Sequence, residues 1–154
     1  MDTAKSVKSL LEKHCIIGID TMAFIYHLEE NRRYLPFTNV LFEMVESGAV
    51  KGVTSVVTIM EILVRPKQEK NEQAMEEYKF TLQTFPNLKI KPIDFGIAEK
   101  AAELRAVYGI KPPNALQIAA SLDEGAKAFV TNDEKLKQVE EIEIIVMKHV
   151  LGIQ

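Results

Sequence analysis

Short, continuous apolar runs recur along this chain, and each is followed by a segment with a helical pattern. The first run covers residues 15–20 (CIIGID), in which the apolar residues end at an aspartate. A run of this kind is typical of a strand that is buried on both faces of a parallel sheet. Because parallel strands need long crossovers, usually helical, the alternation predicts an α/β fold with a mostly parallel sheet.

The same pattern gives an outline of the whole chain. The expected strands are residues 15–20, 52–57, 88–93, 128–131 and 142–147. The expected helices are residues 3–14, 21–29, 37–48, 67–85, 95–108 and 113–122, with others beginning near Thr58 and Asp133. We expect Pro66 to kink or break its helix, and the alternating strand 88–93 to lie near the sheet edge. The length of 154 residues, without repeats or linkers, predicts one domain over residues 1–154.

Composition excludes several classes of protein. The net charge of −3 is unlike the basic footprint of a general nucleic-acid coat, although it permits a nuclease. A single cysteine, Cys15, allows no internal disulfide and predicts a reducing, cytoplasmic setting. We expect Cys15 in the core, at the start of a buried strand. No apolar run is long enough to predict a membrane span, and the first residues lack the apolar region of a signal peptide.

Acidic residues stand at the ends of three expected strands. Asp20 closes the first strand, Glu61 lies in the first helical turn after the second, and Asp133 follows the fourth. Ligands of open α/β sheets bind outside the carboxyl ends of the strands, so we expect these side chains to share one crevice. Asn114, in the first turn of its helix, would reach the same crevice.

Converging carboxylates indicate a bound cation. Like charges a few ångströms apart repel and raise the pKa of each group, and a divalent cation removes that cost. Oxygen ligands without a neighbouring His or Cys suit Mg²⁺ or Mn²⁺ and do not suit zinc. Such a site activates water and holds a phosphodiester for in-line attack.

Each of these residues also has a purely structural interpretation. Asp20, Asn114 and Asp133 are good helix N-cap types, and Thr58 with Glu61 matches a capping box. Taken singly, each residue is better explained as a cap, but their shared position at strand ends favours a site. In another doubly wound fold, Asp20 would be a phosphorylated nucleophile, but no convincing lysine and second-aspartate motif completes that site.

Three ordered stretches carry a resemblance to a known family. They are IDTMAFIYHLEE, TSVVTIMEILVRP and AVYGIKPPNALQIAASLDEGAKAFVTND. With the helices between them, they resemble a PIN domain over roughly residues 15–147, and the closest likeness is to the VapC-like ribonuclease toxins. The third stretch is the most specific of the set.

The resemblance implies a fold, an activity and partners. It implies a three-layer α/β/α fold, cleavage of single-stranded RNA with Mg²⁺ or Mn²⁺, an antitoxin protein that blocks the site, and commonly a homodimer. By position, Asp20, Glu61 and Asp133 match acidic metal ligands of the family, with Thr131 and Asn132 as auxiliary residues beside Asp133. Asn114 stands where the family has an aspartate.

That departure puts the activity in question. An amide oxygen coordinates a cation weakly and brings no negative charge, so we expect weaker metal binding and slower hydrolysis. Asn114 is either a natural change or one introduced to disarm a toxic nuclease. The alternative function is a catalytically inactive PIN module that binds RNA or a protein partner.

Residues for RNA contact are less well defined. Tyr26, Tyr34 and Phe37 are candidate stacking platforms for bases, and a place in the core explains them equally well. Basic residues near expected loops and helix ends form a solvated face or steer a phosphate backbone. They are Arg32, Arg33, Arg65, Lys67, Lys70 and Lys111.

Overall fold

A five-stranded parallel sheet forms the centre of the computed structural model, which describes residues 2–154. The strand order is β3-β2-β1-β4-β5, and all four pairings are parallel. The strands are β1 (Ile16–Ile19), β2 (Lys51–Ser55), β3 (Leu88–Lys91), β4 (Ala128–Thr131) and β5 (Glu143–Val146). The predicted parallel α/β fold is confirmed, and β3 lies at the sheet edge as expected.

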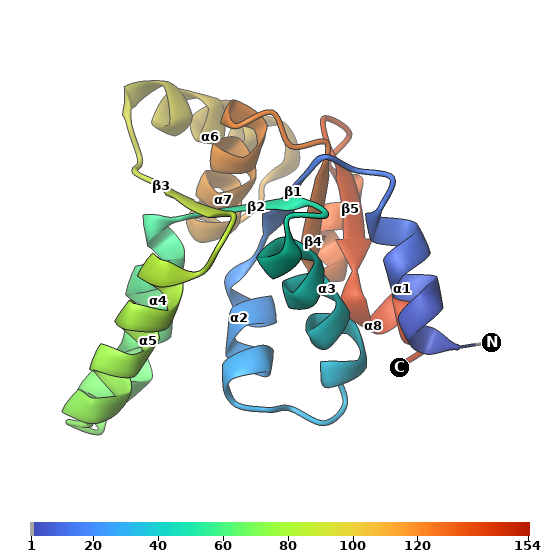
Figure 1. Ribbon diagram of the computed structural model, residues 1–154. Coiled ribbons are helices and arrows are strands. Elements are labelled where there is room, and N and C mark those ends of the chain that lie inside the picture. Colours follow the sequence, from blue (N-terminus) through green and yellow to red (C-terminus); the bar gives the residue numbers. More distant parts are fainter. Residues whose placement is uncertain (1) are drawn as a thin grey trace.

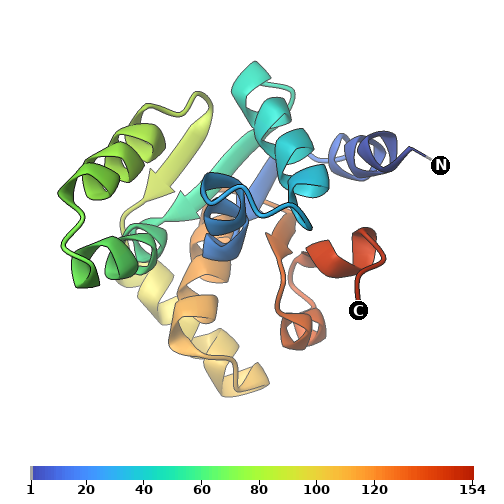
Figure 2. The same ribbon diagram turned by 90° about the horizontal axis from the view of Figure 1, so that it is seen from below.

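Helices cover both faces of the sheet, so the molecule has three layers (Figures 1 and 2). One face carries α6 (Phe95–Tyr108) and α7 (Pro112–Asp123). The other carries α1 (Thr3–Leu11), α2 (Thr21–Leu28) and α3 (Leu35–Ser47). The paired helices α4 (Val56–Gln68) and α5 (Glu72–Thr84) project beyond the carboxyl end of β2 (Figure 1). The short helices η1 (Glu134–Gln138) and α8 (Met147–Val150) follow β4 and β5.

The central strands are apolar throughout because both faces are covered. In β4, Val130 packs into the core beneath α1 and α3, whereas its neighbour Phe129 packs into the core beneath α6 and α7. Successive side chains of a strand point to opposite faces, so a strand with two covered faces reads as one continuous apolar run. This arrangement accounts for the runs seen in the sequence.

Gly18 lets helix α7 approach strand β1 closely. A Cβ atom at this position would lie 2.2 Å from Ser121 Oγ and 2.9 Å from Cδ1 of Phe129. Neither distance is possible without movement of the helix or the ring. The absence of a side chain at Gly18 therefore sets the depth at which α7, with Asn114 in its first turn, sits against the sheet.

Helix α4 differs from its expected bounds at both ends. It begins at Val56, because Ser55 Oγ accepts a 3.2 Å hydrogen bond from the Val57 N–H and caps the helix. Thr58 is therefore an internal residue and is not an N-cap. The expected break at Pro66 was wrong: the helix continues to Gln68. Pro66 lies in the last turn, so only two helical residues follow the hydrogen bond that its missing N–H removes.

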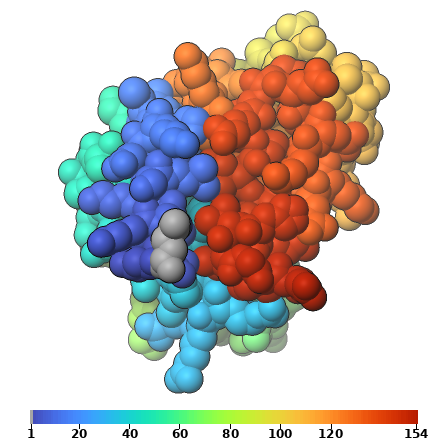
Figure 3. All heavy atoms as spheres, turned by 90° about the vertical axis from the view of Figure 1, so that its right-hand side faces the viewer, coloured from blue at the N-terminus to red at the C-terminus, as the bar shows by residue number. Residues whose placement is uncertain are grey.

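Two further local expectations were wrong. Cys15 is exposed: it precedes β1 at the amino edge of the sheet, where its carbonyl accepts the Lys51 N–H. Residues 142–147 are not all strand, because Met147 begins α8. The surface of α1 borders that of the C-terminal residues (Figure 3). Within residues 2–154, the structure contains no helix with the length and hydropathy that a membrane span requires.

Candidate active site

The four predicted site residues line one cavity of about 610 Å³. It opens at the carboxyl ends of β1 and β4, beside the second turn of α4 and the first turn of α7. Asp20, Glu61, Asn114 and Asp133 all contribute to its wall. Segments up to 113 residues apart in the sequence, from Asp20 to Asp133, therefore meet at this edge of the sheet.

Asp20 is buried, and its carboxylate is held at two points. It directly follows β1 and caps α2, accepting a 2.8 Å hydrogen bond at Oδ1 from the Thr21 N–H. Its Oδ2 accepts a 2.6 Å bond from the Thr131 hydroxyl. The capping interpretation of Asp20 is thus correct in geometry, and it does not prevent the carboxylate from facing the cavity.

The pKa of Asp20 is raised to about 6, chiefly because burial removes water from its carboxylate. Hydrogen bonds from Thr131 and Thr21 act in the opposite direction, and the nearby charges of Glu61 and Asp133 raise the pKa further. Negative charge therefore accumulates at this edge of the sheet at neutral pH. A cation in the cavity would relieve it.

Glu61 reaches the same cavity from the second turn of α4. The Thr21 hydroxyl donates a 2.6 Å hydrogen bond to its Oε1. The expected capping box with Thr58 is absent, because Ser55 caps this helix. Glu61 therefore does not cap α4. Its carboxylate is held at the cavity wall by Thr21 of helix α2.

Asn114 and Asp133 meet across the cavity. Asn114 Nδ2 donates to Asp133 Oδ2 over 3.3 Å. Asn114 is the third residue of α7 and not its cap, which is Lys111. Asp133 caps η1 by accepting the Lys135 N–H at 3.0 Å. The amide thus acts as a donor to the carboxylate, in the opposite sense to that of a metal ligand.

The two auxiliary residues have different surroundings. The Thr131 hydroxyl donates to Asp20 and accepts a 3.2 Å bond from the Asp133 N–H, so it joins two of the acids. Asn132 Nδ2 donates to the hydroxyls of Tyr26 and Tyr34 at 3.1 and 2.9 Å. Its amide nitrogen is therefore occupied away from the acids.

The candidate stacking platforms are mostly occupied by the protein itself. Tyr26 and Tyr34 stack on each other, with ring centroids 4.0 Å apart and planes 6° from parallel. Tyr34 and Phe37 are buried, which supports the core interpretation for both. Tyr26 lines the cavity and keeps part of its surface open.

The donor chemistry of the cavity fits a hard divalent cation. Its lining includes carboxylate and amide oxygens and neither His nor Cys, which suits Mg²⁺ or Mn²⁺. Over residues 2–154, however, no three acidic, His or Cys side chains lie close enough together to bind a single ion. Mg²⁺ keeps several waters and typically uses one or two carboxylates, so the residues present fit such an ion without a closed cage.

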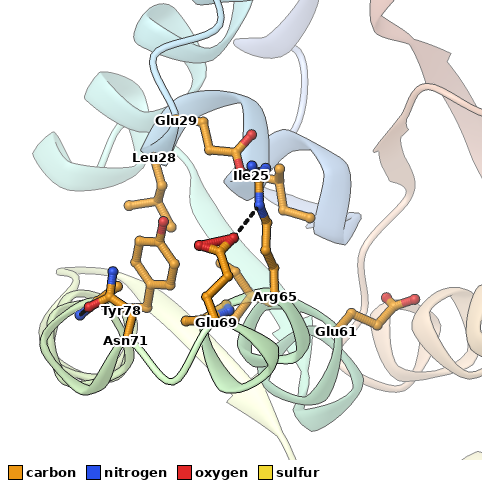
Figure 4. A pocket seen from close by; sticks show the side chains of 11 residues that line it. Ile25, Leu28, Glu29, Glu61, Arg65, Glu69, Asn71 and Tyr78 are labelled. Atoms are coloured by element: carbon orange, nitrogen blue, oxygen red, sulfur yellow. Dashed lines mark hydrogen bonds and ion pairs between the residues drawn. The ribbon is translucent and has the colours of Figure 1, made fainter.

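A second cavity of about 570 Å³ adjoins the first between α2, α4 and α5. Ile25 and Glu61 line both cavities. Figure 4 shows Arg65 between Glu29 and Glu69, with Glu61 apart from this group. Arg65 donates to Glu29 at 3.2 Å and to Glu69 at 2.9 Å.

The basic side chains proposed from the sequence to contact RNA all lie outside the acidic cavity. Arg32, Arg33, Arg65, Lys67, Lys70 and Lys111 are exposed. Lys135 and Lys148 line it instead. Sequence reasoning missed these two lysines, because each lies in a short helix, Lys135 in η1 after β4 and Lys148 in α8 after β5, whose direction depends on the preceding strand end.

Comparison with known proteins identifies the family. The PIN domain family matches residues 17–142. The chain belongs to the PIN-domain family. PIN domains are generally nucleases that use divalent metal ions, so this membership indicates a hydrolase of nucleic-acid phosphodiester bonds. A comparison with the curated proteins gives no match.

Two solved structures share the PIN fold. A VapBC2 complex from Rickettsia felis, bound to a DNA fragment from its promoter, has a chain that aligns with a TM-score of 0.68 and 19% identity, covering 85% of this chain and 98% of that one. A toxin–antitoxin complex from Klebsiella pneumoniae has a chain that aligns with a TM-score of 0.64 and 19% identity, covering 85% and 96%. At this identity, the likeness concerns the fold.

Proposed function

We propose that this PIN-domain protein is a metal-dependent endoribonuclease and the toxin of a toxin–antitoxin pair. The observation that carries the proposal is the convergence of Asp20, Glu61, Asn114 and Asp133 in one cavity. Their oxygen chemistry and the accumulated negative charge support Mg²⁺ or Mn²⁺ as the cofactor.

Each residue has a task in this proposal. Asp20 and Asp133, joined through Thr131, would hold the cation together with Glu61 of α4. When bound, the cation would supply Lewis-acid chemistry for water activation and charge neutralisation. Lys135 and Lys148, on the same cavity wall, attract the RNA backbone toward the acids.

Asn114 limits the activity of this form. It contributes no charge to the cation and donates its amide hydrogen to Asp133. An aspartate at this position would add a ligand and leave Asp133 free. We therefore expect weaker metal binding and slower hydrolysis than in an Asn114→Asp variant.

The partners follow from the same proposal. The two solved structures of similar fold come from toxin–antitoxin complexes, which supports a protein antitoxin for this chain. We also propose a homodimer and a cytoplasmic location, the latter from the single cysteine.

The decisive experiment compares the protein with its Asn114→Asp variant on a varied set of single-stranded RNAs with Mn²⁺. We expect slow cleavage by the native chain and faster cleavage by Asn114→Asp, both stopped by EDTA. Adding Asp20→Asn to the variant is the matched control and should abolish cleavage. A folded Asn114→Asp protein that cuts no RNA in an EDTA-sensitive way would contradict the proposal.

One observation favours a second function, an inactive PIN module that binds RNA or a protein. No three acids of the described chain lie close enough together to share one ion, and Asn114 occupies the fourth position. Calorimetry separates the two proposals. The inactive module predicts little Mn²⁺ binding even after Asn114→Asp, whereas the nuclease predicts clear binding.

A further inference from the structure

A buried glutamine lies one helical turn beyond Asn114 on α7. Gln117 is 1% exposed. Its Oε1 accepts a 2.6 Å hydrogen bond from Ser55 Oγ. Its Nε2 donates to Thr58 Oγ1 at 2.6 Å and to Thr21 Oγ1 at 3.1 Å. Both amide hydrogens are therefore used inside the protein.

The orientation of this amide follows from the carboxylate next to it. Glu61 Oε1 lies 2.6 Å from Thr21 Oγ1, and an ionised carboxylate can only accept a hydrogen bond. Thr21 must therefore donate its one hydrogen to Glu61. Its oxygen then accepts from the other side, where the Gln117 amide nitrogen lies 3.1 Å away. The Thr58 hydroxyl, which is hydrogen-bonded to the same nitrogen, lies 3.0 Å from the Thr21 oxygen.

We propose that Gln117 is a positioning residue, which holds the Glu61 carboxylate at the cavity wall through the Thr21 hydroxyl. A glutamate at 117 would compete for the Thr21 hydrogen. An apolar residue would remove the amide donor to Thr21 and to Thr58, and only the Thr58 hydroxyl would remain on that side of Thr21. An amide is the side chain of this size that offers two donors toward the hydroxyls and one acceptor toward Ser55.

Space filling alone does not explain a glutamine here. Ile118, Ala119 and Ala120, which follow Gln117, are buried apolar residues, and an apolar side chain would fill position 117 equally well. Burying an amide is unfavourable unless it is hydrogen-bonded. The structure meets that requirement with Ser55, Thr58 and Thr21, and the last of these contacts leads to the acidic cavity.

The first test needs no metal. In the EDTA-treated native protein, NMR scalar couplings should report one χ1 rotamer for Glu61, and averaged rotamers in Gln117→Met, which has nearly the same shape. Gln117→Leu replaces it if Gln117→Met does not fold. The matched control is Ser121→Ala on the same helix, whose buried hydroxyl donates to the Gln117 backbone carbonyl. It should keep one rotamer. A single Glu61 rotamer in a folded Gln117 variant would overturn the proposal.

The second test rests on the proposed function and uses the Asn114→Asp background. Gln117→Met and Thr21→Val should each weaken Mn²⁺ binding about tenfold, as is usual when a residue that orients a ligand is lost. The double variant should bind about as weakly as Thr21→Val alone, because both act along one path. Losses that multiply would overturn the path. If the Asn114→Asp protein neither binds Mn²⁺ nor cuts RNA, the proposed function fails. The rotamer measurement still decides the role of Gln117.

Discussion

The amide of Asn114 donates a 3.3 Å hydrogen bond to Asp133 Oδ2. This contact makes Asn114 a partner of the acid opposite it. An aspartate at 114 would reverse the relationship from attraction to repulsion. The identity of residue 114 therefore affects both the stability of the metal-free protein and its affinity for a cation.

Asn114→Asp should destabilise the metal-free protein and increase its response to Mn²⁺. We expect the free energy of unfolding to fall by about 1–3 kcal/mol at pH 7.5, because a donor to Asp133 is replaced by a like charge. Urea unfolding in EDTA measures the loss, and repetition with Mn²⁺ should recover more stability in the variant than in the native chain. Asn114→Ala, which removes the bond without adding charge, should show a smaller loss and no greater Mn²⁺ response. Equal responses to Mn²⁺ in the native and Asp forms would contradict the prediction.

Asp20 should make the metal-free protein less stable as pH rises. Its folded pKa of about 6 lies above the unfolded value, so the folded state binds the proton more tightly. This contribution to stability is fully present below pH 4 and is lost as pH rises through 6, by about 3 kcal/mol in total.

The variant Asp20→Asn lacks the titrating carboxyl group, so comparison with it measures the contribution of Asp20. The free energy of unfolding of the variant minus that of the native protein should become more positive from pH 4 to pH 8, with both proteins in EDTA. Subtracting one protein from the other cancels the titrating groups that do not interact with Asp20, which leaves Asp20 and its neighbours Glu61 and Asp133. A difference that stays constant with pH would show that Asp20 is not perturbed.

Thr131→Val should remove the link between Asp20 and Asp133 in the acidic cavity. The change removes the hydroxyl that donates to Asp20 and the acceptor for the Asp133 N–H. We expect a loss of about 1–3 kcal/mol in unfolding free energy and a higher pKa for Asp20, which NMR titration measures. Thr131→Ser keeps the hydroxyl and should keep the pKa of Asp20. A similar Asp20 pKa in the Val and Ser variants would refute this role.

Gly18→Ala should displace helix α7. The new Cβ would lie 2.2 Å from Ser121 Oγ, and overpacking of this kind costs about 1–3 kcal/mol. Thermal unfolding measures the loss. Adding Ser121→Gly removes the two atoms nearest to the new Cβ, although the Phe129 ring remains, and should recover part of the stability. A double variant no more stable than Gly18→Ala would show that the strain lies elsewhere.

The sequence was sufficient to predict the fold because its strongest signals are local. The apolar runs ending at Asp20 and before Asp133 predicted buried parallel strands, and the structure has them. The wrong expectations concern the ends of helix α4, where a single side chain determines the boundary. Ser55, and not Thr58, caps the N-terminus of α4. Pro66 lies close enough to the C-terminus of this helix to be tolerated.

The shared location of the acidic residues was also predictable from the sequence. A parallel sheet brings the carboxyl ends of its strands to one edge, so Asp20, Glu61 and Asp133 were expected near one another. The cavity lined by all three agrees with that placement. Their roles as ligands and the cation itself remain predictions.

Only the tertiary structure decided how these side chains are held. The Thr21 hydroxyl on Glu61, the Gln117 amide behind it and the donor role of Asn114 join α2, α4, α7 and the β4–η1 turn. A hydrogen bond depends on fractions of an ångström and on the direction of a donor, and residues that make it can be 96 positions apart, as Thr21 and Gln117 are. Periodicity and spacing place elements at an edge of the sheet, but they contain no information on that direction. The packing of α7 against Gly18 brings Asn114 and Gln117 to their partners, and the packing of α2 against α4 brings Thr21 to Glu61.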